Sequence, residues 1–187
     1  MKRNKSFFLL LILASVTVNI SGQYVKEEAP PLRERIFFAG NLGLQLGTYT
    51  NIQLAPSVGI WLLPRLSLAV GPTYQFYKDP LGKTDIYGIR TYSEFLLIRD
   101  FNNLVPIGYN AGFYTHIEYE GISLRKNYWI APYNEDGRFM VNSALVGFGL
   151  SQNIGPRSAM TFTLLWVITD NEFGIYGNPE IRIGFMF

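Results

Sequence analysis

Residues 36–76 read IFFAGNLGLQLGTYTNIQLAPSVGIWLLPRLSLAVGPTYQF. Large apolar residues alternate here with small or polar ones, a period of two that indicates β-strands with two different faces. The first segment, for example, sets Phe38 and Leu42 on one face and Asn41 on the other. The same alternation continues in two further segments, which we expect to be strands at 51–62 and 66–76.

The second face of these three segments distinguishes between two kinds of barrel. It carries Gly, Ala, Ser, Asn and Gln, and the three segments contain no Asp, Glu, Lys or Arg. A soluble barrel such as a lipocalin needs a solvated outer face. The observed face is a poor solvent surface but fits a narrow, packed lumen. The pattern therefore favours a barrel whose apolar face points outward into a membrane.

Five more segments with weaker alternation follow, with boundaries good to about two to four residues. They are expected at 84–98, 107–120, 138–153, 158–169 and 179–187. The total is eight strands, which predicts an all-β, eight-stranded antiparallel up-and-down transmembrane β-barrel over residues 36–187.

The connections differ in length, as they do in bacterial outer-membrane barrels, where periplasmic turns are short and outer loops long. Short turns are expected at 63–65 and 155–157, and long aromatic loops at 121–137 and 170–178. This pattern places both termini in the periplasm. The connection at 99–106 is longer than this scheme favours, and the first outer loop, Thr48–Thr50, is very short.

Aromatic residues on the apolar face of the expected strands lie near the strand ends, as in the aromatic girdles of membrane barrels. Those expected at the outer ends are Tyr74, Phe76, Tyr87, Tyr119 and Trp166, and those at the periplasmic ends are Phe38, Phe185 and Phe187.

The first 22 residues have the layout of a secretory signal peptide. Lys2, Arg3 and Lys5 precede the apolar run 7–14, which is too short for a helix that spans a bilayer. Residues 1–22 are therefore expected to be removed, and 23–35 to form a charged, Pro-rich periplasmic tail. The chain has no cysteine, so it is neither a lipoprotein nor a disulfide scaffold.

Composition argues against several function classes. Without residues 1–22 the chain has 13 basic and 14 acidic residues, so nucleic-acid binding is not expected. One histidine and no cysteine give no metal cluster, and no glycine-rich loop is placed to hold a phosphate. No cofactor is expected.

The chain ends IRIGFMF, an alternating strand with terminal aromatics at Phe185 and Phe187. This ending looks like the C-terminal signal that outer-membrane barrels present to the barrel assembly machinery. Together with the stretches FFAGNLGLQLGTYTNIQLAPSVGIWLLPRLSLAVGPTYQFYKD, TDIYGIRTYSEF and YGNPEIRIGFMF, it resembles small outer-membrane β-barrel proteins of the Bacteroidota. The resemblance covers residues 36–187 and implies the fold and contact with outer-membrane lipid more than any activity.

Three function classes remain open. The first, which we favour, is a non-enzymatic structural or interaction role, such as an accessory subunit that contacts other outer-membrane proteins. The second is a lipid-modifying enzyme, which would need a His, a Ser and an acid on the outer, membrane-facing rim. The third is a small-molecule pore, which is disfavoured because side chains just fill an eight-stranded lumen.

Two groups of residues are candidate sites. Several charged residues lie at strand positions that are expected to face the inside of the barrel. We expect them to pair with one another and to have a structural role. This lumen polar cluster consists of Arg90, Glu94, His116, Glu118 and Arg182, with Glu120 and Glu180 as further members. A proton relay is the functional alternative for this cluster. The long outer loop carries Tyr128, Trp129 and Tyr133, which either cap the barrel mouth against loop 170–178 or contact a partner.

Two prolines within the strands predict a register. If the turn at 63–65 pairs Leu62 with Leu66, Pro56 lies opposite Pro72. Both missing backbone donors then fall at one level of the wall.

Overall fold

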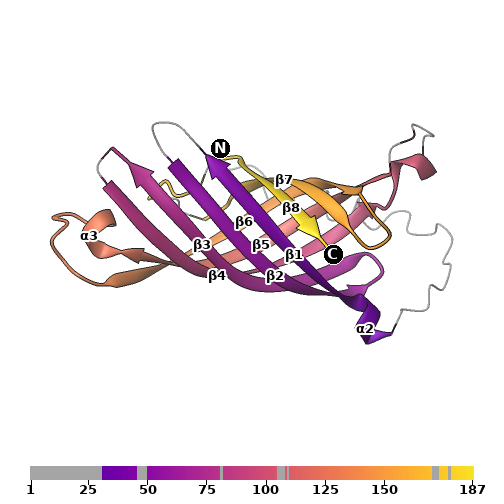
Figure 1. Ribbon diagram of the computed structural model, residues 1–187, viewed down its shortest axis with the longest axis horizontal. Helices are drawn as coiled ribbons and strands as arrows, with labels where there is room; N and C mark the ends of the chain where they lie inside the picture. The colour runs from indigo at the N-terminus through magenta and orange to yellow at the C-terminus, as the bar shows by residue number, and fades with distance from the viewer. Residues whose placement is uncertain are drawn as a thin grey trace, which may run out of the picture.

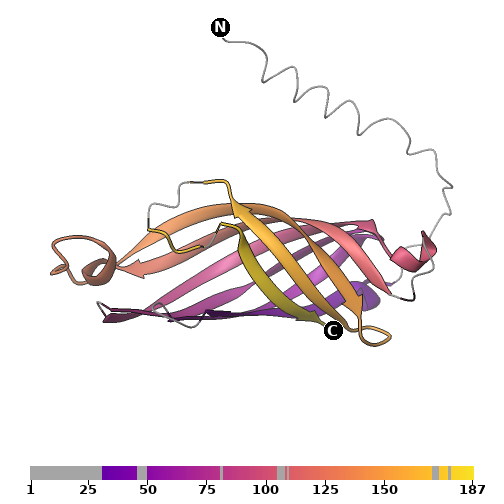
Figure 2. The same cartoon turned by 90° about the horizontal axis from the view of Figure 1, so that it is seen from above.

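The computed structural model describes residues 31–45, 50–80, 82–104, 108, 110–169, 173–176 and 178–187. The expected signal peptide, the tail up to residue 30 and most of the first outer loop lie outside these residues. The chain forms one closed barrel in which each strand pairs with its sequence neighbours and β1 pairs with β8 (Figures 1 and 2). The prediction of an all-β, eight-stranded antiparallel barrel is thus confirmed.

The elements alternate in direction along the barrel. They are α2 (Leu32–Arg35), β1 (Ile36–Gln45), β2 (Thr50–Leu63), β3 (Leu66–Asp79), β4 (Gly82–Ile98), η1 (Phe101–Asn103), β5 (Ala111–Arg125), α3 (Lys126–Trp129), β6 (Arg138–Asn153), β7 (Ala159–Val167) and β8 (Glu180–Met186). The short helix α3 projects at one end of the barrel, and α2 lies at the other (Figure 1). We call these the α3 end and the α2 end. None of the described helices is long and apolar enough to cross a membrane.

Two predicted boundaries need correction. The fifth strand was expected at 107–120 but runs from Ala111 to Arg125. The long loop therefore starts at residue 126 and not at 121, because apolar inward residues Ile122 and Leu124 continue the alternation and are buried in the barrel. The third strand likewise extends to Asp79, so that β3 and β4 meet in a tight turn.

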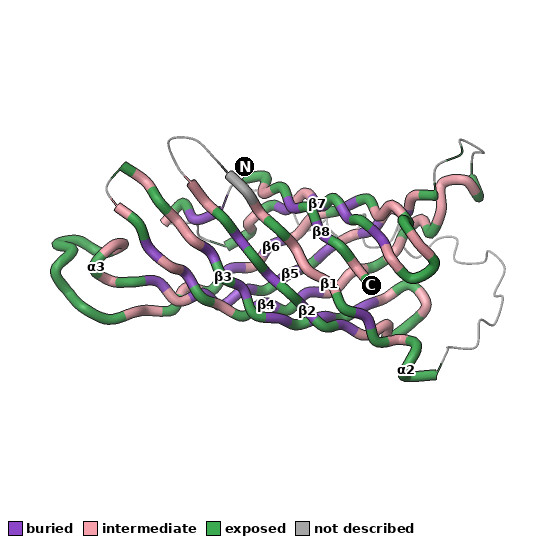
Figure 3. The backbone as a smooth tube through the Cα atoms, in the orientation of Figure 1, coloured by how far each residue is buried: buried purple, intermediate pink, exposed green. Residues whose placement is uncertain are grey.

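Side-chain burial follows the predicted alternation (Figure 3). Along β3 the residues Ser67, Ala69 and Thr73 are buried, while Leu68 and Val70 between them are exposed. Apolar side chains thus cover the outside of the barrel, and along β3 small and polar side chains face inward. The aromatic residues Tyr74, Tyr87, Tyr119 and Trp166 are also on the outside.

The β2–β3 hairpin keeps the predicted register except at its turn. Leu63, and not Leu62, pairs with Leu66, with a bulge between Trp61 and Leu63. The extra residue is absorbed in that bulge, so the pairs Leu54–Tyr74 and Val58–Val70 flank Pro56 and Pro72 symmetrically. The two prolines therefore lie opposite one another, and no backbone pairing is formed between 55–57 and 71–73.

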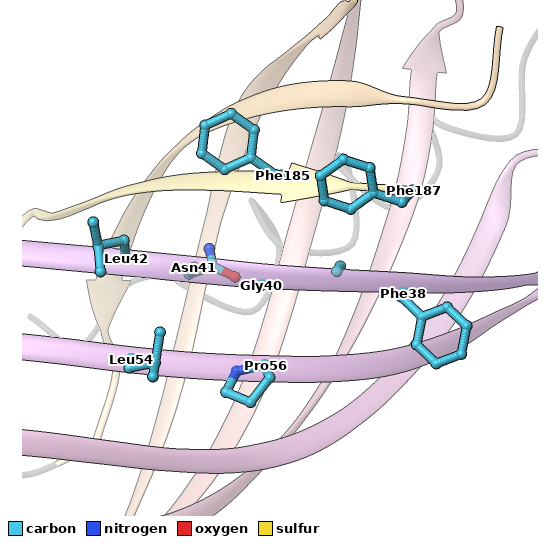
Figure 4. Close-up of a pocket in the computed structure, with 9 residues that line it drawn as sticks. Phe38, Gly40, Asn41, Leu42, Leu54, Pro56, Phe185 and Phe187 are labelled. Atoms are coloured by element: carbon cyan, nitrogen blue, oxygen red, sulfur yellow. The ribbon is translucent and has the colours of Figure 1, made fainter. Parts of the chain in front are cut away.

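The last residues close the barrel. Phe187 and Phe38 exchange two backbone hydrogen bonds, of 2.7 and 3.0 Å, beyond the four pairs of β8 with β1. On the outside of this seam, Phe185, Phe187 and Leu42 surround Gly40 and border a shallow apolar hollow of about 280 Å³ (Figure 4). The hollow exists because Gly40 has no side chain above the wall.

The interior has three layers. Phe37, Ala69 and Tyr92 form a small apolar cluster towards the α2 end. A larger apolar cluster fills the interior towards the α3 end and includes Ile122, Leu145 and Ile175. Arg90, Glu118, Glu120 and Arg182 form the third layer between these clusters and are at most 2% exposed. The side chains of Glu94 and Glu180 lie at the edges of this layer and are 13% and 16% exposed.

Candidate functional site

The charged layer of the lumen is built by three strands. β4 contributes Arg90 and Glu94, β5 contributes His116, Glu118 and Glu120, and β8 contributes Glu180 and Arg182. Register brings β4 and β5 together directly, since Arg90 pairs with Glu120 and Glu94 with His116. β8 is not their neighbour, but the barrel is narrow enough for its arginine to reach across.

Glu118 is the centre of this layer. Its Oε1 accepts a hydrogen bond of 2.5 Å from Arg182 Nη1, and its Oε2 lies 3.1 Å from His116 Nε2. The second arginine is further away, with Arg90 Nη1 4.0 Å from Glu118 Oε2. One carboxylate therefore joins three cationic or hydrogen-bonding groups from three strands.

Arg182 contacts three carboxylates. Besides Glu118, its Nη2 lies 3.7 Å from Glu120 Oε1 and its Nε donates to Glu180 Oε1 at 3.3 Å. Glu120 also accepts a hydrogen bond of 2.6 Å from the hydroxyl of Tyr176. Arg182 and Glu120 are at most 1% exposed, so these contacts stand in for water at most of their polar atoms, while Arg182 Nη2 and Glu120 Oε1 have only their mutual ion pair.

Arg90 is held mainly by neutral groups. Its Nη2 donates to Asn41 Oδ1 at 2.6 Å and to the backbone oxygen of Ala55 at 3.0 Å. Its guanidinium carbon lies 5.4 Å from the ring centroid of Tyr92. The Tyr92 ring stacks in turn on His116, with 4.9 Å between the ring centroids.

His116 lies between two carboxylates. Its Nδ1 is 3.0 Å from Glu94 Oε1, and its Nε2 faces Glu118. A neutral imidazole has one donor and one acceptor nitrogen, whereas an ionised carboxylate only accepts. The two contacts are both satisfied when the ring is an imidazolium. The layer then holds three cations, Arg90, His116 and Arg182, and four carboxylates, of which Glu180 is the most exposed.

The structure thus brings the five predicted lumen residues into one network. Sequence reasoning did not include three of its members: Asn41, Tyr92 and Tyr176. Asn41 and Tyr92 share the inward parity and could have been found from it. Tyr176 gave no such signal, because it belongs to the loop between β7 and β8 and reaches the lumen only by folding back into the barrel.

The histidine of the lumen is enclosed by its own network. His116, the single histidine of the chain, is buried in the interior and contacts Glu94, Glu118 and Tyr92. Among the described residues no group of three or more His, Cys, Asp or Glu side chains is arranged to hold a metal ion. The cations and carboxylates of the network pair with one another, which is the chemistry that its geometry supports best.

The aromatic residues of the α3 end fall into two groups. Trp129 packs on Tyr77 and Phe173, with ring centroids 5.4 and 6.1 Å apart, and belongs to the rim of the large apolar cluster. Tyr128 packs on Tyr77 as well, and burial together with a hydrogen bond to Asp79 raises the pKa of its phenol above the usual value. These two residues cover the barrel mouth.

Tyr133 is different. Its side chain is 59% exposed, and its backbone has a φ of 65°, a left-handed conformation that is uncommon for a tyrosine. Nearby, Ile130 is 40% exposed. Tyr128 and Trp129 thus lie against the barrel mouth, whereas the Tyr133 side chain is exposed.

Comparison with known proteins adds no family to this description: no family model and no curated protein matches the chain.

Proposed function

We propose that this chain is a bacterial outer-membrane β-barrel with a structural or interaction role, both termini lying in the periplasm after removal of residues 1–22. The observation that carries the proposal is the inverted distribution of polarity across the wall. Buried side chains include Arg90, Glu118 and Arg182, whereas Leu54, Val70 and Ile89 are 44–59% exposed. A water-soluble protein has the opposite arrangement, and a lipid-exposed barrel has this one.

The ends of the barrel agree with the same assignment. Exposed aromatics near the α3 end (Tyr74, Tyr87, Trp166) and near the α2 end (Phe38, Phe185, Phe187) border the apolar wall, whereas Tyr119 lies nearer its middle. Such girdles mark the two membrane interfaces of outer-membrane barrels. The α3 end, with its long aromatic loop, is then the outer end.

A first experiment tests the location. The full chain is expressed in a Bacteroidota host, and inner and outer membranes are separated on a sucrose gradient. We expect the protein in the outer-membrane fraction, with residues 1–22 absent by N-terminal sequencing. On gels without heating it should migrate as a compact species that shifts after boiling. A protein that stays in the soluble fraction and shows no such shift would overturn the proposal.

An interaction role is preferred to transport because the lumen is filled. Arg90 and Arg182 are each 1% exposed, and apolar clusters lie on either side of them. Charged and apolar side chains of the described residues occupy the lumen at these levels, which argues against open diffusion, so activity is expected at the outer loop and on the wall. Reconstitution into planar bilayers should give no stepwise conductance. Steady single-channel currents would favour the pore hypothesis instead.

Partner binding is assigned to the exposed tip of the outer loop. Tyr133 has the exposure of an interface aromatic and a strained backbone of the kind found at functional positions. A crosslinking pulldown from native membranes should recover other outer-membrane proteins with the wild type and fewer with Tyr133→Ala. Tyr128→Ala is the matched control, because its ring packs on the mouth. A lipid A mass spectrum changed by gene deletion, with unchanged pulldowns, would favour the enzyme instead.

A further inference from the structure

Four basic residues stand together on the outside of the barrel at the α3 end. Lys78 of β3 pairs directly with Lys83 of β4, and Arg125 of β5 pairs directly with Arg138 of β6. We call these four residues the cationic rim. All four share the outward parity of their strands, because their neighbours Thr84, Leu124 and Tyr77 are buried or half-buried on the other face.

The pairing of like charges is the unusual feature. Side chains directly opposite one another on neighbouring antiparallel strands are close, and like charges in these positions are destabilising. Lys78 and Lys83 are both exposed, and within the described part of the chain neither has a carboxylate within ion-pair distance. Two such pairs on adjacent hairpins form a surface that is complementary to anions.

The nearby carboxylates are already engaged. Asp85 accepts a hydrogen bond of 2.8 Å from the Tyr74 hydroxyl, and its Oδ2 lies 3.6 Å from Arg125 Nη2. Asp79 is on the other parity and accepts from the backbone N–H of Gly82 at 2.9 Å. Glu135, above the rim, is paired with Lys126 at 3.2 Å. Among the described residues, Asp85 is the one carboxylate within 4.0 Å of a cation of the rim.

One of the four cations is held rigidly in place. Arg138 Nε donates to Ser123 Oγ at 2.8 Å, and its Nη2 donates to the backbone oxygens of Asp85 and Ser123. Its guanidinium carbon lies 4.9 Å from the Tyr87 ring centroid. A preorganised arginine loses less entropy when it binds an anion than a freely rotating side chain.

The position of the rim identifies the anion. It lies next to the outward-facing pair Tyr74 and Tyr87, whose ring centroids are 5.5 Å apart. In a membrane barrel such tyrosines mark the level of the lipid headgroups. We propose that the cationic rim binds the phosphate groups of an outer-leaflet phosphorylated glycolipid, lipid A. This inference rests on the proposed outer-membrane location, and the two charge pairs suit a headgroup with two phosphates.

The test uses the mature barrel refolded in detergent micelles, with native mass spectrometry to count bound lipid A. The double variant Lys78→Gln/Lys83→Gln is compared with Arg65→Gln/Arg157→Gln, which removes the same charge from exposed turns at the α2 end. Two basic residues near a charged lipid surface correspond to a roughly 10- to 30-fold weaker affinity. We expect this loss in the lysine variant and less than about a two-fold change in the control.

Three comparisons make the result specific. Dephosphorylated lipid A should bind the wild type at least as weakly as bisphosphorylated lipid A binds the lysine variant, because Arg125 and Arg138 remain in that variant. Inorganic phosphate, at a concentration equal to that of the lipid, should not displace it, and displacement would overturn the assignment to a lipid. Without lipid the lysine variant should be at least as resistant to urea as the wild type, because a repulsive pair has been removed.

The two proposals fail in different ways. If the heat-dependent shift on gels shows that the lysine variant is folded, yet it binds lipid A as tightly as the wild type, the cationic rim is not the site. The outer-membrane location would then remain. If the wild type does not insert into lipid vesicles at all, the proposed location fails and the rim proposal fails with it.

Discussion

Arg182 illustrates how a single residue stabilises the interior of this barrel. It is fully buried and contacts Glu118, Glu120 and Glu180 on two strands. Buried ion pairs of this kind contribute little in comparison with an apolar core, but the removal of one partner leaves an uncompensated charge. The loss of Arg182 would therefore cost more stability, by leaving buried carboxylates unpaired, than its ion pairs contribute in themselves.

Replacement of Arg182 by Met should lower the free energy of unfolding by about 3–5 kcal/mol, because Glu118 and Glu120 lose their shared cation. The measurement is urea unfolding of the barrel in lipid vesicles, followed by tryptophan fluorescence. Arg157→Met in an exposed turn is the control and should change stability by less than about 0.5 kcal/mol. An unchanged midpoint for Arg182→Met would mean that the lumen is hydrated and not packed.

Tyr176 is a second single residue that stabilises the interior, and it belongs to a loop and not to a strand. Its hydroxyl donates to Glu120, a carboxylate with 0% exposure. Tyr176→Phe keeps the ring in the apolar cluster and removes this donor, so we expect a loss of about 1.5–3 kcal/mol. The same unfolding experiment measures it, with Tyr119→Phe on the outside of the barrel as the control. Equal effects of the two changes would rule out a specific role of this hydrogen bond.

In the β2–β3 hairpin the two strands approach each other closely. At the level of Pro56 and Pro72 the usual backbone ladder is absent. A Cβ atom added at Gly71 would lie 2.0 Å from the backbone oxygen of Pro56. The glycine thus permits the close contact of two strands that lack two amide donors.

Gly71→Ala should destabilise the barrel by about 1–3 kcal/mol, since backbone atoms must move to accommodate the methyl group. Gly40→Ala is the matched control, because a Cβ atom there is at least 3.7 Å from its neighbours. We expect the control to remain within about 0.5 kcal/mol of the wild type. Thermal shifts on gels for both variants provide the comparison, and equal tolerance would contradict the close approach.

The segment around α3 forms the cap of the barrel mouth. Trp129 contacts Tyr77 and Phe173 from two other loops or strands. Trp129→Ala should therefore lower stability by about 2 kcal/mol, through loss of buried apolar area. Tyr133→Ala should change it by less than about 0.5 kcal/mol. Urea unfolding of the two variants distinguishes a capping residue from an exposed one, and the reverse order would assign the roles the other way round.

The whole molecule depends on one seam. β1 and β8 are joined by four residue pairs and by the two hydrogen bonds between Phe38 and Phe187. A barrel has no free strand edges only if this seam closes, and an open edge exposes unpaired backbone groups. The terminal phenylalanines also cover the outside of the seam (Figure 4).

Deletion of Phe185 to Phe187 should prevent membrane insertion, because it removes most of the pairing of β8 with β1 and the expected assembly signal. We expect no compact species on unheated gels and the protein in the periplasm. Deletion of three residues from the exposed outer tip, Asn134 to Asp136, is the control and should leave insertion unchanged. A truncated protein that still shows heat-dependent migration would contradict this role of the C-terminus.

The sequence by itself determined the strands of this protein and the faces that they present to the inside and the outside of the barrel. Alternation with a period of two is a local property, so it correctly predicted eight strands, their inner and outer faces and the inward position of Arg90, Glu118 and Arg182. The opposition of the two prolines was also predicted correctly, although the Leu62–Leu66 pair used to derive it was wrong and a bulge restores the register. The end of β5 was misjudged because Ile122 and Leu124, apolar and inward, break the polar lumen pattern of the residues before them.

Contacts between distant segments were decided only by the tertiary structure. The central role of Glu118, the reach of Arg90 to Asn41 and the entry of Tyr176 into the lumen depend on which strands face one another across the closed barrel. The cationic rim likewise appears only when the register pairs Lys78 with Lys83 and Arg125 with Arg138. Parity places a side chain on a face, but neighbours on that face come from strand pairing and closure, which involve residues far apart in the chain.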